Sequence, residues 1–215
     1  MLPHLAALER QMVKGAGLAV LHYALCVPKG APGNKLLNWI GGHYEEHWSV
    51  NPFWSARFDT LPRHPVTGGV EPFAIRDEWY YHMRFQPGMI GVTPILTANP
   101  PEKTREGPDG PHSGNPTVRS RKGMPEHVAW VYERPGGGRG FGLTGGHYHW
   151  AWGEKNFRQV VLNGIAWVAG LDVPPGGIPA KALSWSDLTA NQEVAAPIGF
   201  GPEDARKVIG VELPI

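Results

Sequence analysis

The sequence contains little cysteine, little net charge and no long apolar run, and each shortage excludes a class of protein. Its single cysteine, Cys26, excludes a framework of internal disulfides. A formal net charge of +1 provides no long-range field that would attract nucleic acid, and we interpret the basic cluster at residues 118–123 as a solvated loop. No apolar stretch approaches the roughly 20 residues that span a bilayer. We therefore expect neither a nucleic-acid partner nor a transmembrane segment.

The N-terminal residues also lack the uninterrupted apolar core of a signal peptide, because charged residues are interspersed among the apolar ones over residues 1–15. The chain as given is therefore expected in the cytoplasm. A segment ahead of residue 1 would instead allow a periplasmic or secreted location.

Glycine and proline, by contrast, are abundant. Their 29 and 22 residues predict many tight turns and long irregular connections between short elements. Hydrophobic residues make up 41% of the chain, which is enough for the core of one domain of ordinary size. The stretch over residues 97–125 is rich in glycine, proline and charge, and a loop of that length is usually either functional or mobile.

The hydrophobic pattern predicts an α/β sandwich with a largely parallel sheet. Leu18–Leu21 is a short continuous apolar run, as expected for a strand buried on both faces, and His22 follows at its carboxyl end. The other expected elements are helices over residues 4–14, 34–40 and 155–168, strands over 53–58, 73–75 and 89–96, and a hairpin of 127–133 with 138–144. Pro94 makes its strand an edge or irregular strand. The Pro-rich, weakly periodic sequence of residues 171–215 predicts an extended tail with a short helix near 202–207.

The tetrapeptide Gly-Gly-His-Tyr occurs twice, at residues 41–44 and 145–148, but the flanking sequences differ and predict coincidence instead of duplication. In the first copy, His43 and His47 have the spacing of the zinc-protease helix His-Glu-x-x-His. Tyr44 occupies the position of the catalytic glutamate, which argues against a protease of that type. The histidine pair can still provide one ligand to a different site.

Candidate functional side chains gather where strands end. His22 and His147 each follow an expected strand, and strand ends at one edge of an open α/β sheet form its usual functional site. Taken singly, each histidine is better explained as a neutral ring bonded to the backbone, and only the pair of them together favours a functional site. Asp77 and Glu78 follow another strand beside aromatic residues, a combination that suits a sugar site. The alternative is a strand-end turn with satisfied carboxylates.

Cys26 is the one thiol that could act as a nucleophile. A nucleophile elbow places its residue at the turn between strand and helix, and His22 occupies that turn. Cys26 comes four residues too late, so a buried structural thiol is the favoured interpretation.

Five stretches in order, "GLAVLHYAL", "IGGHYEEH", "RHPVTGG…PFAIRDEWY", "PEHVAWVYERPGGGRGFGLTGGHYHWAW" and "FRQVVLNGIAWVAG", resemble the ThuA-like (trehalose utilisation) family. The family's fold is similar to that of class I glutamine amidotransferases. The resemblance implies a flavodoxin-like three-layer sandwich with a mostly parallel sheet and an antiparallel hairpin. It places a domain over residues 1–170, without the family's two N-terminal strand-helix units, and a Pro-rich extension over 171–215 packed on that domain.

The resemblance also implies a function in carbohydrate metabolism. The protein would act on a disaccharide or keto-sugar, as a sugar hydrolase, lyase or isomerase. The implied catalytic residues are His22, Glu78 and His147, the substrate-binding residues are Asp77, Trp79, Tyr80 and Tyr148, and the ligands of a divalent zinc, manganese or iron ion are His22, His47, Glu78 and His147. Because His22 lies near the elbow where the amidotransferases carry cysteine, a Cys-dependent glutamine amidotransferase is not implied. Two alternatives stay open. The chain could be a non-catalytic carbohydrate-binding or accessory domain, or an inactive truncated member of the family that forms a homodimer over Leu18–Leu21.

Overall fold

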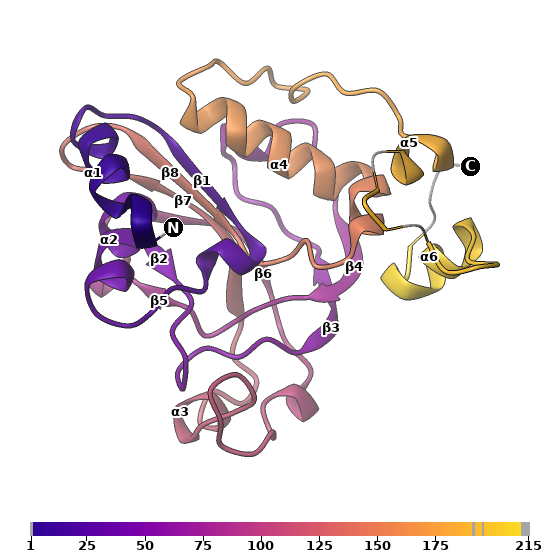
Figure 1. The fold of residues 1–215 in the computed structure, drawn as a ribbon, viewed down its shortest axis with the longest axis horizontal. Coiled ribbons are helices and arrows are strands. Elements are labelled where there is room, and N and C mark those ends of the chain that lie inside the picture. The colour runs from indigo at the N-terminus through magenta and orange to yellow at the C-terminus, as the bar shows by residue number, and fades with distance from the viewer. Residues whose placement is uncertain (1, 191, 195, 212–215) are drawn as a thin grey trace.

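A four-stranded sheet of order β1-β8-β7-β6 lies at the centre of the computed structural model, which describes residues 2–190, 192–194 and 196–211 (Figure 1). Its strands are β1 (Leu18–Leu21), β6 (Val92–Ala98), β7 (Glu126–Glu133) and β8 (Arg139–Leu143). Only β1 and β8 are parallel, whereas β7 runs antiparallel to both β8 and β6. The prediction of a mostly parallel sheet is therefore wrong, and the sheet is mixed. It is mixed because β7 forms antiparallel pairs with β8, in the predicted hairpin, and with β6, the predicted irregular edge strand.

Strand β1 is an edge strand of this sheet and not the doubly buried central strand expected from its sequence. Val20 alone is fully buried, and its neighbours are partly exposed. The run is apolar because both faces of β1 still meet packed side chains. Val20 joins the core under α2, while Ala19 and Leu21 pack on the core under α4.

Helices cover both faces of the sheet (Figure 1). One face carries α1 (Leu5–Val13) and α2 (Ala31–Ile40), and the opposite face carries α4 (Lys155–Val168). Glycine lets α2 approach β8 closely, since a Cβ on Gly140 would lie 2.4 Å from the Ile40 Cα. These helices confirm the three that the periodicity predicted.

Two small antiparallel hairpins flank the sheet: β3 (Phe53–Phe58) with β4 (Phe73–Glu78), and β2 (Gly42–His43) with β5 (Arg84–Phe85). Burial alternates along β3 and β4, as the alternating sequence of a half-buried strand requires. Along β4 the buried positions are Phe73, Ile75 and Asp77. Glu78 is the last residue of β4 and lies at the edge of the core.

The long stretch between β6 and β7 has defined structure, with a 3-10 helix at Glu102–Thr104 and the short helix α3 (Pro116–Arg119). A buried ion pair ties it to the start of β7. Arg105 Nη1 lies 2.9 Å from Glu126 Oε1, and both side chains are almost fully buried. Arg105 also donates to the Met124 carbonyl oxygen.

After α4 the chain forms two more helices, α5 (Trp185–Thr189) and α6 (Pro202–Ile209). The predicted helix near residues 202–207 is thus confirmed, whereas α5 was not predicted. The capping box of Ser184 and Asp187 was a readable signal for it. Leu188 and Ile209 are buried against the main core, but the division into two domains stays a prediction.

Further 3-10 helices lie at Leu2–His4, His22–Leu25, Pro65–Thr67, Pro87–Met89 and His149–Gly153. Among the helices of the described ranges, none is long and apolar enough to cross a membrane.

Stability is expected to fall on acidification because several histidines are buried. Burial lowers the pKa of His43, His64, His82 and His127 from the ordinary value of 6.5. Below about pH 6.5 the unfolded chain therefore binds protons that the folded chain does not, and stability falls by up to about 1.4 kcal/mol per pH unit and proton until the folded pKa is passed. Melting temperatures at pH 7.5, 6.5 and 5.5 should fall with pH. A melting temperature that is constant or rises across this range contradicts the expectation.

Candidate functional site

Three elements bring one histidine, one glutamate and a second histidine together. His22 begins the 3-10 helix that follows β1, Glu78 ends β4, and His147 lies in the loop after β8. Their potential ligand atoms all lie within 4.8 Å of one another, and they form the only such group of three or more His, Cys, Asp or Glu residues in the part of the chain that the structure describes. We call these three residues the His–Glu–His cluster.

Both imidazoles of the cluster approach the same carboxylate oxygen. His147 Nδ1 lies 2.9 Å from Glu78 Oε2, and His22 Nε2 lies 3.4 Å from it. The two rings meet edge to face with centroids 5.4 Å apart. Two donor atoms that each lie about 2.1 Å from one metal are roughly 3.0–3.4 Å apart in octahedral or tetrahedral coordination. The two nitrogen–oxygen distances therefore fit a shared divalent ion.

The hydrogen bond on the other side of the His22 ring defines its tautomer. Nδ1 lies 2.8 Å from the Thr144 carbonyl oxygen, which can only accept, so Nδ1 carries a proton. In a neutral ring, Nε2 then presents a lone pair to the Glu78 carboxylate. Two lone pairs repel each other, and the contact becomes favourable when either a second ring proton or a metal cation lies between them.

Asp77 fixes the loop that carries His147. Its carboxylate is fully buried. Four backbone N–H groups donate to it, from Glu78 at 2.7 Å, Gly146 at 2.9 Å, His147 at 3.0 Å and Tyr148 at 3.4 Å. The bonds satisfy the buried charge and hold the loop after β8 against the end of β4. These contacts give Asp77 a structural role, and the predicted substrate contact stays a prediction.

Trp79, also predicted to contact substrate, packs in the core. Its side chain is fully buried, its Nε1 donates to the Ile75 carbonyl oxygen at 3.1 Å, and its ring packs against Phe58 and Phe157. A Cβ on Gly145 would lie 2.6 Å from this ring, so the loop after β8 rests directly on Trp79. In this structure the Trp79 ring has no exposed face on which a sugar could stack.

The two tyrosines predicted to bind substrate lie at the cluster's border. Tyr80 Oη is 3.2 Å from His22 Nε2, and burial, followed by the Glu78 charge, raises the pKa of Tyr80 well above its usual range. The hydroxyl therefore stays neutral and can donate. Tyr148 is partly buried, accepts a hydrogen bond from Arg76 at 2.9 Å and packs against the His147 ring.

Asn51 is a contact that sequence reasoning missed. Its Nδ2 donates to Glu78 Oε1 at 3.0 Å and so holds the carboxylate oxygen that the histidines do not approach. Asn51 precedes β3 and belongs to no motif, so the sequence contained no signal for this role.

His47, the fourth predicted metal ligand, lies outside the His–Glu–His cluster. The residue is exposed, and its backbone N–H donates to the Pro111 carbonyl oxygen at 2.9 Å. The neighbouring His43 is buried, with its Nδ1 donating to the Tyr44 carbonyl oxygen. Three of the four predicted ligands, His22, Glu78 and His147, thus lie together, and His47 lies apart from them.

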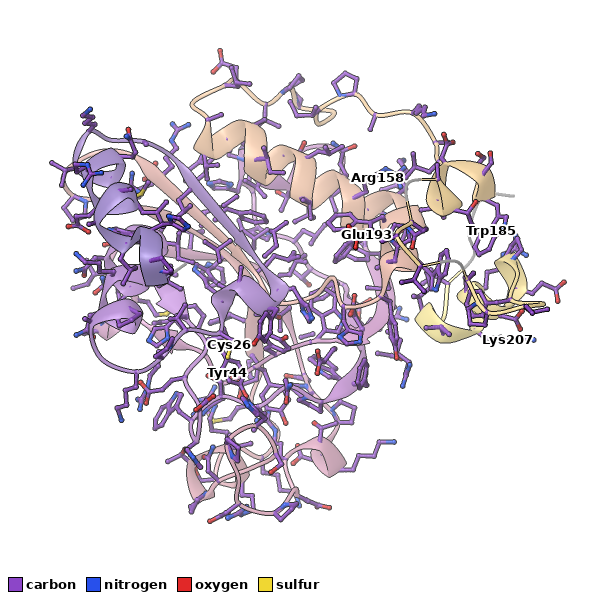
Figure 2. The ribbon with its side chains drawn as sticks, in the orientation of Figure 1. Cys26, Tyr44, Arg158, Trp185, Glu193 and Lys207 are labelled. Carbon is purple, nitrogen blue, oxygen red and sulfur yellow. The ribbon has the colours of Figure 1, made fainter. Side chains whose placement is uncertain are left out.

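Cys26 lines a small cavity beside the cluster, next to Tyr44 (Figure 2). Burial and the nearby Glu46 raise the pKa of its thiol, which disfavours the reactive thiolate. The cavity measures about 80 Å³ and is lined by Tyr23, Cys26, Tyr44, Asn51, Tyr80 and His112. Two of these residues, Asn51 and Tyr80, also contact the cluster, so the cavity lies beside it.

Two imidazole nitrogens and one carboxylate oxygen form a ligand set known from zinc and from non-haem iron sites, in which the remaining positions stay open for water or substrate. The hydrogen bonds from His22 to Thr144 and from Asn51 to Glu78 are the outer contacts that orient such ligands. The donor set therefore fits a divalent metal.

Comparison with known proteins identifies the family. Among curated proteins, none matches the chain. A solved structure of a putative ThuA-like protein from Bacteroides uniformis is similar, with a TM-score of 0.52 and 19% sequence identity over 78% of this chain. The chain covers 64% of that protein, which is less than two thirds of its length. The family model for ThuA, described as trehalose utilisation, matches residues 3–168, and the chain therefore belongs to the ThuA family.

Proposed function

We propose that this protein is an enzyme of carbohydrate utilisation that acts on a disaccharide or keto-sugar at the His–Glu–His cluster, with a divalent metal held by His22, Glu78 and His147. The observation that carries the proposal is the approach of two imidazoles to a single carboxylate oxygen, at 2.9 and 3.4 Å. The family's description as trehalose utilisation supports a sugar as the substrate.

The chemistry follows from the positions of the side chains. A divalent metal in the cluster would polarise a sugar carbonyl or a water molecule. The Thr144 carbonyl orients His22, the Asp77 carboxylate holds the loop of His147, and Asn51 orients Glu78. Tyr80 keeps a neutral hydroxyl 3.2 Å from His22 Nε2, where it can donate a hydrogen bond within the cluster.

A metal-free acid/base centre is the second candidate. The pair of Glu78 and His147 favours it, because the 2.9 Å contact orients an imidazole whose side chain is 43% exposed and thus open to substrate. In this case a second proton on His22 would make its contact with Glu78 favourable. Hydrolases, lyases and isomerases all employ such pairs.

The proposal is tested by metal content and sugar turnover of His147→Ala, with His149→Ala as the control. His149 is two residues away, lies outside the cluster and bonds to the Leu188 carbonyl oxygen. We expect the wild-type protein to bind one zinc or manganese ion, and His147→Ala to lose at least about 100-fold in metal affinity together with its turnover, because a direct ligand should count for more than an outer-shell partner. His149→Ala should retain both properties.

The outcomes separate the candidates. Turnover that needs no metal and is lost in His147→Ala favours the acid/base centre. Saturable sugar binding without turnover by the full-length protein favours a non-catalytic carbohydrate-binding domain. Unchanged turnover of every accepted sugar in His147→Ala contradicts a catalytic role for this residue.

A further inference from the structure

The C-terminal helices pack on the loop that carries His147, although they lie outside the match to the family. The family model covers residues 3–168, whereas α5 and α6 come later in the chain. Just after His147, Trp150 stacks on Trp185 of α5 with ring centroids 4.8 Å apart and packs against Phe200 ahead of α6. Helix α6 itself packs beside β4 (Figure 1). The C-terminal helices therefore cover this loop from outside.

Arg76 joins α6 to the same loop. Its Nη1 donates to the Tyr148 hydroxyl oxygen at 2.9 Å and to the Val208 carbonyl oxygen at 3.3 Å. Val208 lies in the last turn of α6, where the helix dipole places partial negative charge that stabilises a guanidinium. One end of α6 thus holds the guanidinium against the loop after β8.

The two rings that Arg76 contacts also border the imidazole of His147. The guanidinium carbon lies 5.6 Å from the centroid of the Phe53 ring and 5.7 Å from that of the Tyr148 ring, within the range of cation–π attraction. The His147 ring meets both of these rings edge to face, with centroids 4.9 and 5.3 Å away. A single guanidinium therefore contacts both aromatic neighbours of the imidazole.

The orientation of this imidazole depends on those two neighbours. Asp77 holds only the backbone of the loop, because its bonds to the loop all come from N–H groups. The His147 side chain is 43% exposed and has Glu78 Oε2 as its polar contact at 2.9 Å. A side chain displaced by about 1 Å no longer fits a site that needs exact geometry. Packing against Phe53 and Tyr148 thus decides whether Nδ1 faces Glu78.

We propose that α6 belongs to the functional site and acts on it through Arg76, a positioning residue. The end of α6 holds the guanidinium, and the guanidinium holds the rings of Phe53 and Tyr148. These rings in turn orient His147 toward Glu78. The inference rests on the proposed function, and it gives the C-terminal extension a role in forming the His–Glu–His cluster.

The test replaces Arg76 by methionine, with Arg57→Met as the matched control. Both arginines lie on the outward face of the β3–β4 hairpin, but Arg57 is 74% exposed and pairs with the exposed Asp59. Loss of a nearby cation would by itself strengthen the binding of a divalent metal, because like charges repel. Weaker zinc binding by Arg76→Met would therefore report lost positioning and not lost charge.

Two measurements are made on each protein. Zinc affinity is measured by calorimetry at a temperature at which every variant is folded, and backbone hydrogen exchange of residues 144–153 is measured by mass spectrometry on metal-free protein. We expect Arg76→Met to bind zinc roughly 10-fold more weakly, as is typical when an outer-shell partner is lost. Its residues 144–153 should exchange at least about fivefold faster, because the loop opens more readily. Arg57→Met should match the wild type in both.

Tyr148→Phe provides a second variant that keeps the charge of Arg76. It removes only the hydroxyl that accepts from Arg76 Nη1, so both quantities should change in the same direction as in Arg76→Met but by less. If Arg76→Met does not fold, Tyr148→Phe decides the question, and wild-type values for it would overturn the positioning role.

The same conclusion follows if Arg76→Met binds zinc as tightly as the wild type or more tightly, or if its residues 144–153 exchange no faster. Wild-type protein that binds no zinc would contradict the metal of the proposed function. Hydrogen exchange on the metal-free protein would then decide the positioning role by itself.

Discussion

Glu78→Gln is expected to abolish metal binding at the His–Glu–His cluster and, with it, sugar turnover. Both imidazoles approach Glu78 Oε2, and glutamine keeps the size of the side chain but removes its negative charge. Loss of an outer-shell partner typically lowers metal affinity 10–100-fold, so loss of the central ligand should exceed about 100-fold. Zinc or manganese titration by calorimetry, followed by turnover assays with added metal, measures the effect.

Two further variants calibrate this result. Asn51→Ala removes only the hydrogen bond to Glu78 Oε1 and should lower metal affinity by about 10–100-fold. Glu71→Gln changes an exposed glutamate outside the cluster and should leave affinity and turnover unchanged. If Glu78→Gln binds metal as tightly as Glu71→Gln, the cluster is not the metal site.

Asp77→Asn is expected to destabilise the protein by roughly 3 kcal/mol, because a buried amide cannot accept all the hydrogen bonds that the carboxylate accepts from four backbone N–H groups. One of its two acceptor atoms becomes an NH₂ group facing backbone donors. For a chain of this size the loss corresponds to a fall in melting temperature of about 6–12 °C. Metal affinity should fall as well, since the loop of His147 loses its anchor.

The control for this variant is Asp59→Asn. Asp59 is 62% exposed and pairs with the exposed Arg57, so its loss should change stability by no more than about 0.5 kcal/mol. Differential scanning calorimetry and zinc titration of both variants give the comparison. A melting temperature of Asp77→Asn that matches the wild type would show that Asp77 does not hold the loop.

The proximity of His22 and His147 was within reach of the sequence, because they follow β1 and β8, which are parallel neighbours in one sheet and end at the same edge. Glu78 ends β4 of a separate hairpin, and that rule does not place it beside the two histidines. The hydrogen bonds that hold the cluster in place could not be predicted, because they join residues far apart in the chain. Asp77 accepts from a loop about 70 residues away, and Asn51 donates to Glu78 across a hairpin. The burial of Asp77 and Trp79 could not be predicted either, and their roles as substrate contacts stay predictions.

The direction and order of the strands could not be predicted for a related reason. Four apolar residues at Leu18–Leu21 indicate packing on both faces but not whether a neighbour lies on each edge. The hairpin of β7 and β8 was predicted correctly from its Gly-rich turn, yet its consequence, a mixed sheet, was not drawn. Helices of strong periodicity, such as α4, were predicted at their observed bounds, Lys155–Val168.

Anomalous diffraction from crystals grown with zinc or manganese tests the central claim most directly. The cluster predicts one strong peak about 2.0–2.2 Å from His22 Nε2, Glu78 Oε2 and His147 Nδ1, which are normal metal–ligand distances. The peak should disappear in crystals of Glu78→Gln. A wild-type crystal with no peak at these three atoms, or with its metal bound elsewhere, would contradict the account.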